Sequence, residues 1–292
     1  MNRLLFSLLF IVSFTACEKN IDFKLQESNP TLVVDAEIEN GSAPRVMLTK
    51  SFSYYSQLSA TALLNSFVHD AEVYISNGQY THRMKEFTYP IFPGLNGYYY
   101  GIDSSSLNTA FVGELNTSYQ LRIVADGKEY RSQTSITPLN IKPDSIYFKP
   151  APFNPDTNKR VMMIKITEPA GLGNYIRYFT KRNSEPFFPG FNSVFSDEVI
   201  DGSTITFQLE PGVNRNDLPK PGDNFFMKGD TVSIRYSNID RSAYTFWSTW
   251  EFSQQSIGNP FAQPVKVLGN VSNGALGAFC GYASWYNTYI VD

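Results

Sequence analysis

Few residues in this sequence have the types and the spacing that enzymes use for chemistry. The 292 residues include two histidines, His69 and His82. Neither histidine has the spacing of a zinc-ligand pair, and neither lies beside a serine in a nucleophile elbow. His82 alternates with Tyr80 and Met84, as residues on one face of a strand do, which favours a packed or hydrogen-bonded structural histidine. The histidines therefore give no indication of catalysis.

Acidic residues offer a second kind of chemistry near residue 200. Asp197, Glu198 and Asp201 could form a carboxylate pair for a weak hydrolase, or could bind calcium. The ordered ladder of acidic positions that a calcium loop needs is absent, and the sequence has no glycine-rich phosphate loop. We expect a solvated loop here, in a protein that is not an enzyme and has no metal or cofactor.

The two cysteines are Cys17 and Cys280. A catalytic cysteine usually needs a nearby histidine as its base, and neither histidine is near Cys280 in the sequence. We interpret Cys280 as a small buried hydrophobic residue. If Cys17 carries lipid, no intrachain disulfide can form, and the stability of the fold must come from burial.

The most suggestive pattern is a near-repeat of one loop that is rich in proline and phenylalanine. Residues 90–96 read PIFPGLN, and residues 186–192 read PFFPGFN. Paired prolines stiffen a loop and hold its aromatic side chains in place, so little entropy is lost when they dock. The alternative is that both loops fold back over the edges of the fold. The candidate contacts with a partner or ligand are Phe92, Pro93, Phe187, Phe188 and Phe191.

Strands must position the first of these loops. Residues 31–39 alternate apolar and polar side chains, which is typical of a half-buried strand. Asn77-Gly78 and Asp126-Gly127 each lie between two such runs, the first directly before a strand over residues 79–87, and both pairs predict hairpins with type I′ turns. We count about seven strands before residue 137, at the spacing of an immunoglobulin-like antiparallel sandwich over residues 31–137.

A linker and a second β-rich domain follow. Residues 138–143 contain two prolines and no periodicity, so we interpret them as the interdomain linker. Residues 144–292 form the second domain, which is also mostly β and closes with two predicted strands over residues 277–285 and 286–291. Its other strand patterns lie at residues 144–148, 161–168, 174–182, 204–210 and 230–238. The expected fold is mainly β: an N-terminal immunoglobulin-like antiparallel sandwich and a second β-sandwich domain that carries one amphipathic helix.

That helix is predicted over residues 240–257. Its apolar residues recur at helical spacing, Asp240 is placed to cap its first turn, and residues 258–260 (Gly-Asn-Pro) end it. Trp247 and Trp250 lie on the apolar face, and we interpret them as core residues that cover one sheet or one end of the second sandwich.

The N-terminus resembles a bacterial lipoprotein signal. Arg3 precedes an apolar run over residues 4–14, which is too short for a permanent membrane-spanning helix but suits a secretory signal. Small residues then precede Cys17, which would be acylated and begin the mature protein. We expect a signal peptide over residues 1–16, and a lipidated cysteine and polar tether over residues 17–30. The alternative is an ordinary cleaved signal with a chance cysteine.

The overall composition excludes another class of function. Charged residues make up 17% of the chain, aromatic residues make up 15%, and the net charge is −3. These values are typical of a globular, aromatic-rich protein, and they provide no basic surface for DNA or RNA. We therefore expect no nucleic-acid partner.

Three stretches are similar to one family: residues 17–23, residues 258–261 and residues 270–279. They resemble the Bacteroidetes outer-membrane lipoproteins catalogued as domain of unknown function 4249. Genes of this family commonly lie beside those of SusC-like TonB-dependent receptors, so the resemblance implies an accessory lipoprotein with a receptor partner. No catalytic residues are described for the family. Glu18 and Asp22, close behind the cysteine, resemble the surface-export signals of these bacteria.

The sequence thus favours a lipid-anchored outer-membrane protein that faces the cell exterior. We expect it to bind a SusC-like TonB-dependent receptor and to help capture or gate a nutrient ligand, without catalysis. The alternatives are a surface adhesive or structural binding protein and, less favoured, a hydrolase. Residues 144–146 and 230–232 also resemble the short O-glycosylation sequon of these bacteria.

Overall fold

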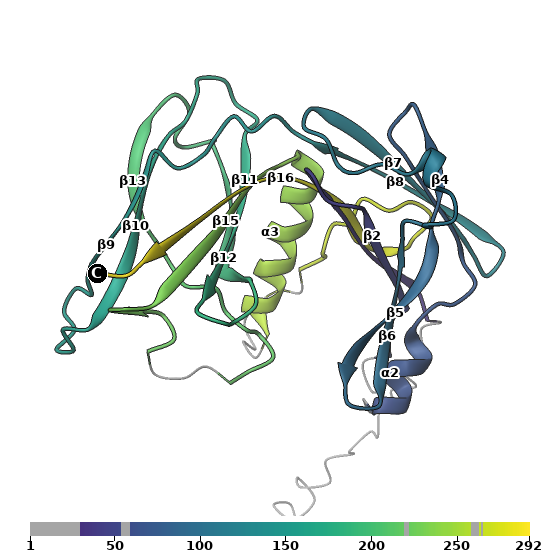
Figure 1. Cartoon of the computed structure of the whole chain (residues 1–292), viewed down its shortest axis with the longest axis horizontal. Helices are drawn as coiled ribbons and strands as arrows, with labels where there is room; N and C mark the ends of the chain where they lie inside the picture. Colours follow the sequence, from purple (N-terminus) through teal and green to yellow (C-terminus); the bar gives the residue numbers. More distant parts are fainter. Residues whose placement is uncertain (1–29, 54–58, 219–221, 258–262, 264) are drawn as a thin grey trace, which may run out of the picture.

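The computed structural model describes residues 30–53, 59–218, 222–257, 263 and 265–292. The expected signal peptide, Cys17, almost all of the tether and the predicted helix end at 258–260 lie outside the described residues. The described part forms three β-sheets and two α-helices, α2 (Ala60–Ser66) and α3 (Arg241–Ser256), with a short 3-10 turn at Leu107–Thr109 (Figure 1). Within these residues, neither helix is long and apolar enough to cross a membrane. The predicted mainly β fold with one long helix is confirmed.

One eight-stranded sheet, which we call the long sheet, runs through both halves of the molecule (Figure 1). In spatial order its strands are β12 (Phe188–Ser196), β11 (Tyr175–Arg182), β15 (Thr231–Ile239), β16 (Leu276–Ile290), β1 (Leu32–Glu39), β2 (Arg45–Lys50), β6 (Leu95–Gly101) and β5 (Lys85–Phe92). The first small sheet comprises β4 (Thr81–Arg83), β3 (Glu72–Ser76), β7 (Thr117–Ala125) and β8 (Lys128–Ile136). The second comprises β13 (Thr204–Leu209), β10 (Lys159–Thr167), β14 (Phe226–Met227) and β9 (Ser145–Pro150).

Strand β16 joins the two halves of the long sheet. It pairs in parallel with β1 from Leu276 to Tyr282, and then antiparallel with β15 from Tyr282 to Ile290. The prediction of two closing strands is therefore wrong, because they are one continuous strand of 15 residues. No turn separates them because Trp285 and Tyr286 both continue the ladder with β15.

Each small sheet packs on the long sheet and encloses a hydrophobic core. Strand β16 contributes Phe279 and Ala283 to the first core, and Trp285 and Tyr289 pack against the second. Because successive side chains of a strand point to opposite faces, these odd-numbered residues place both cores on one face of β16. Fully buried residues of the two cores include Val34, Leu48, Ile75 and Leu121 in the first, and Ile164, Phe226, Ile234 and Tyr236 in the second.

Helix α3 covers the opposite face of the long sheet near its middle (Figure 1). Asp240 caps the helix, as predicted, because its Oδ1 accepts a hydrogen bond from the N–H of Ala243 at 2.8 Å. The other oxygen, Oδ2, accepts from the hydroxyl of Thr134 and from the N–H of Ser135 on β8. Trp247 packs against the third buried cluster, as expected of a core residue. One carboxylate thus ties the helix of the second half to the small sheet of the first.

The two predicted hairpins form, but with different turns. Asp126 and Gly127 both have positive φ, 50° and 72°, as a type I′ turn requires. Asn77 lies instead in a four-residue turn between β3 and β4, where its side chain accepts from the N–H groups of Gln79 and Tyr80. The predicted type I′ turn at Asn77-Gly78 is wrong because capping by the asparagine side chain fixes a longer turn.

Three further segments differ in detail from the sequence predictions. The strand expected over residues 79–87 is two strands, β4 and β5, which belong to different sheets on either side of the buried Met84. Helix α2, between β2 and β3, has no counterpart in the sequence predictions. Residues 138–143 have no regular structure, but Asn238 anchors Ile141 by hydrogen bonds to both its N–H and its carbonyl oxygen.

Gly281 of β16 lies against the backbone of β8. A Cβ atom at this position would lie 2.5 Å from the carbonyl oxygen of Ser135, closer than real Cβ atoms come to another atom. The N–H of Gly281 also donates to the hydroxyl of Thr134 at 2.7 Å. Glycine here therefore lets the first small sheet reach the shared strand.

We predict that Gly281→Ala lowers the free energy of unfolding by about 1–3 kcal/mol, because the backbone of β8 must move to admit the methyl group. Urea unfolding of both proteins measures the difference. Gly101→Ala is the control, since its nearest neighbour would be a side-chain atom of Tyr99 at 3.1 Å. Equal losses in the two variants would contradict the close approach at Gly281.

Candidate functional site

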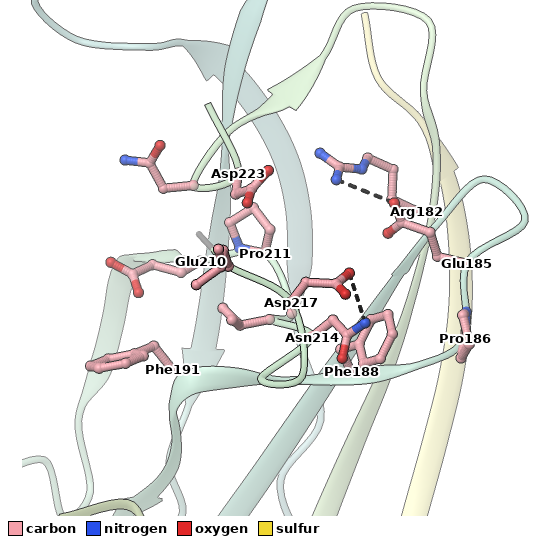
Figure 2. Close-up of a pocket in the computed structure, with 14 residues that line it drawn as sticks. Arg182, Glu185, Pro186, Phe188, Phe191, Glu210, Pro211, Asn214, Asp217 and Asp223 are labelled. Atoms are coloured by element: carbon pink, nitrogen blue, oxygen red, sulfur yellow. Dashed lines mark hydrogen bonds and ion pairs between the residues drawn. The ribbon is translucent and has the colours of Figure 1, made fainter. Parts of the chain in front are cut away.

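A hollow in the second half, which we call the edge cleft, has a volume of about 610 Å³ (Figure 2). It lies where β11 ends and β12 begins, and the loop after β13 closes its other side. Its lining residues are Arg182, Glu185, Pro186, Phe188, Phe191, residues 210–214, Asp217, Leu218, Asp223 and Asn224. A volume of this size lies in the range of small-molecule sites.

Two of the predicted contact residues, Phe188 and Phe191, line the edge cleft. Phe188 is half-buried, and Phe191 is 43% exposed and lies at the side of the cleft, near Glu210 (Figure 2). Phe187, between Pro186 and Phe188, does not line the cleft. Its ring instead packs edge-on against Tyr286 of β16, with 5.7 Å between centroids.

A large bulge in β12 presents Phe191 to the cleft. Arg177 pairs with Val194, whereas Phe179, two residues later on β11, pairs with Pro189, so residues 190–193 bulge from the ladder. Gly190 is required at this point, because a Cβ atom there would lie on the hydroxyl of Tyr178. The segment predicted as the loop 186–192 is therefore largely an edge strand with a bulge.

Helix α3 fixes this bulge through a buried carboxylate. Glu251 is 3% exposed and accepts from both the N–H of Ser193, at 2.9 Å, and its hydroxyl, at 2.5 Å. The same serine oxygen accepts from Nε of Arg177 at 3.3 Å. Arg215 holds the bulge from the other side, because its Nη2 donates to the carbonyl oxygens of Gly190 and Phe191.

The edge cleft is rich in hydrogen-bond acceptors. Its carboxylates are Glu185, Glu210, Asp217 and Asp223, and Arg182 is the cationic residue among those that line it. Arg182 is already engaged, since it pairs with Glu185 at 3.3 Å and donates to the carbonyl oxygen of Phe225. A ligand that donates hydrogen bonds suits this cleft, whereas an anion does not.

The first copy of the motif lies far from the second in the sheet. Phe92 and Pro93 are at the tip of the β5–β6 hairpin, and Phe92 is 66% exposed. Strands β5 and β12 are the two outermost strands of the long sheet, so the structure places the copies at opposite edges and does not bring them together. Pro90 and Pro189 lie within these edge strands, where a residue without an N–H hinders pairing with another strand.

A second hollow, of about 550 Å³, lies on the outer face of the long sheet in the first half. Arg45 lies over the rings of Tyr89 and Tyr99, at 5.0 and 4.8 Å from their centroids, and Phe87 stacks on Tyr99. The aromatic side chains are half-buried and lie on β5 and β6, and Arg45 lies on β2. The sequence analysis did not single them out, although Tyr98–Tyr100 form an aromatic run.

Two of the three acidic candidates near residue 200, Asp197 and Asp201, have structural roles. Asp197 is 2% exposed, and its Oδ2 accepts from the N–H groups of Gly173 and Asn174. Asp201 accepts from the N–H of Gly171 at 2.6 Å, whereas Glu198 is exposed. The expectation of a solvated loop is therefore wrong for Asp197, because its carboxylate is buried to hold the loop before β11. Among the described residues, no group of three acidic, histidine or cysteine side chains could hold a metal.

The remaining candidates are structural, as predicted. His82 is fully buried, and its Nε2 accepts from the N–H of Asp103 at 2.9 Å. Burial lowers the pKa of His82, which keeps the imidazole neutral. Cys280 is 2% exposed, and burial raises the pKa of its thiol to about 12. A thiol with this pKa is not a nucleophile at neutral pH.

Comparison with known proteins identifies the family. The sequence model of the family described as "Domain of unknown function (DUF4249)" matches residues 18–285. The chain belongs to this family. No curated protein matches the sequence. The match begins directly after Cys17 and includes the edge cleft, α3 and most of β16, so all three are parts of a DUF4249 domain.

The sequence analysis of this DUF4249 chain missed Glu251, Ser193 and Arg177. A signal for Glu251 exists, because it lies four residues after Trp247 and therefore on the same face of α3. An acidic residue on an apolar face must have a buried partner. The partner could not be named, since Ser193 is 58 residues away in the sequence.

We predict that Glu251→Ala lowers the free energy of unfolding by about 2–4 kcal/mol, because it leaves the buried N–H and hydroxyl of Ser193 without their acceptor. Urea unfolding measures this loss. Gln254→Ala, an exposed position on the same helix, is the control and is expected to change stability by less than about 0.5 kcal/mol. Unchanged stability of Glu251→Ala would show that the bulge does not depend on the carboxylate.

Proposed function

We propose that this chain is a lipid-anchored outer-membrane accessory protein that binds a TonB-dependent receptor and helps to capture or gate a nutrient, without doing chemistry. The observation that carries the proposal is the edge cleft, a hollow of about 610 Å³ with two phenylalanines and several carboxylates. The receptor partner rests on the family resemblance, and the anchor rests on the sequence around Cys17.

The side chains of the edge cleft favour a particular class of nutrient. Phe188 and Phe191 offer apolar surface, while Glu210 and Asp217 offer acceptors to hydroxyl or ammonium groups. Asn214 donates to Asp217 at 2.9 Å and so holds that carboxylate in place (Figure 2). A polyhydroxylated or cationic molecule with an apolar face fits this combination.

The two edges of the long sheet are the surfaces that we propose for the receptor. Phe92 is exposed at one edge and Phe191 at the other, and each lies on a strand that is paired on one side alone. Exposed aromatic residues on a rigid strand lose little side-chain entropy when they bind, which makes them effective anchors.

A mild-detergent pull-down of the tagged, lipidated chain from its native outer membrane tests this proposal. We expect one TonB-dependent receptor in near-equal amount, identified by mass spectrometry. Phe92→Ala is expected to lower its recovery about tenfold, as loss of an interface anchor does. Leu107→Ala is the matched control, since Leu107 is 65% exposed and Phe92 66%. If no β-barrel receptor co-purifies with the chain, the proposal is wrong.

The anchor has a separate test. We predict that Cys17→Ala releases the protein from washed membranes and leaves the fold intact, because the cores described above need no lipid to be buried. Fractionation measures the release, and the urea midpoint of the purified variant checks the fold. Retention of this variant in membranes that lack the receptor would contradict the anchor.

The second hollow, on the outer face of the long sheet in the first half, favours the alternative of a surface adhesive or structural binding protein. The exposed Arg45 and the half-buried Tyr89 and Tyr99 form a cationic and aromatic surface that is separate from the edge cleft. If the pull-down recovers no receptor, protein and glycan arrays with an Arg45→Ala control test this alternative.

A further inference from the structure

A second cavity in the second half, which we call the apolar cavity, lies between the long sheet and the second small sheet. Its volume is about 360 Å³. Ile176 of β11 and Tyr236 of β15 line it from the long sheet, and Ile166, Ile205 and Phe207 line it from β10 and β13. The apolar cavity is separate from the edge cleft. The cavity lies at the start of β11 and the end of β12, whereas the edge cleft lies at the end of β11 and the start of β12.

The two carboxylates at its rim are already paired. Glu168, which is 2% exposed, accepts from Asn174 at 2.8 Å and from the N–H of Gly202 at 2.7 Å. Asp197 accepts from two backbone N–H groups, as described above. Two carboxylates at the rim oppose the entry of an anion, and the apolar walls offer nothing to a cation.

Tyr236, in the wall of the cavity, is a buried tyrosine whose hydroxyl is unpaired within the described part of the chain. Tyr236 is 1% exposed and lines the cavity, yet no described residue forms a hydrogen bond with its hydroxyl. Other buried tyrosines have partners: the hydroxyl of Tyr100 donates to the carbonyl oxygen of Val68, and that of Tyr119 accepts from the N–H of Glu114. The Tyr236 hydroxyl therefore has its donor capacity left for an acceptor inside the cavity.

The cavity reaches the surface at the turn between β12 and β13. Val199 lines it and is 92% exposed, and the neighbouring Ile200 is half-buried. A ligand can therefore enter beside this turn without separation of the two sheets.

We propose that the apolar cavity binds a neutral, mainly apolar small molecule that offers one hydrogen-bond acceptor to Tyr236. Straight-chain alcohols and esters are of this class. The charge at the rim excludes fatty-acid anions, and the volume suits a small ligand and not a peptide segment. This inference is independent of the proposed function, because the cavity shares no lining residue with the edge cleft and involves neither Phe92 nor Phe191.

Equilibrium titration tests the proposal with the full chain carrying Cys17→Ala, purified without detergent, since detergent would compete for the cavity. The neutral fluorophore N-phenyl-1-naphthylamine is expected to bind at one site with a rise in emission. The series 1-hexanol, 1-heptanol and 1-octanol should displace it, with affinity rising about fourfold per methylene. Octanoate at neutral pH should displace it at least about tenfold less well.

Variants locate the site. Ile205→Trp fills the cavity and should abolish binding of the fluorophore, whereas Thr206→Trp, the exposed neighbour on the same strand, should not. Ile200→Trp at the mouth is a second blocking variant in case the first does not fold, and urea midpoints check each protein. Tyr236→Phe should lower 1-octanol affinity about five- to tenfold while fluorophore binding persists.

Three outcomes would overturn the proposal. They are no rise in emission, unchanged binding in a folded Ile205→Trp or Ile200→Trp variant, and equal affinity for 1-octanol and octanoate. Unchanged 1-octanol affinity in Tyr236→Phe would remove the assigned role of the hydroxyl. None of these results depends on receptor recovery in the pull-down, so the two proposals can fail separately.

Discussion

Strand β16 is the constraint on which the rest of the structure depends. Its 15 residues span about 50 Å and form backbone hydrogen bonds with β1 along the first part and with β15 along the second. Buried backbone groups that lose their partners cost free energy, so neither sandwich can lose this strand without damage to the other. The two halves therefore share one wall. The contacts of Asp240 and Gly281 with β8 then fix the first small sheet to the same strand.

The central position of β16 in the long sheet determines which strands lie at the edges of that sheet. Because β16 and β1 occupy the middle of the long sheet, β5 and β12 become its outermost strands, and each carries one copy of the near-repeat. Proline within an edge strand discourages sheet-to-sheet association, which gives the repeated motif a structural reason of its own. The same placement leaves Phe92 and Phe191 exposed. The motif thus protects the edges and presents aromatic side chains at both.

Features that depend on residues close together in the sequence could be predicted. Features that depend on partners distant in the sequence could not. Alternation identified β1, and the pair Asp126-Gly127 identified its turn, because both signals are local. The alternation of side chains along β16 does not reveal its pairing, because the first part pairs in parallel with β1 and the second part pairs antiparallel with β15. Strand β12 was missed because its proline, its glycine and its bulge disrupt the period of two. In the site, Phe188 and Phe191 were found from composition, whereas Glu251 was missed because its partner is distant in sequence.

Carboxylates show how this fold separates binding surfaces from structural supports. At the start of β11, Glu168 and Asp197 are buried and accept hydrogen bonds from the surrounding chain, so they have little capacity left for a ligand. At the other end of the same strand, Glu210 is exposed and no described side chain pairs with it. Acidic residues alone would have suggested chemistry at the first end. Their hydrogen-bond partners leave free acceptors at the second end, where we propose a polar ligand, and few at the first end, where we propose an apolar one.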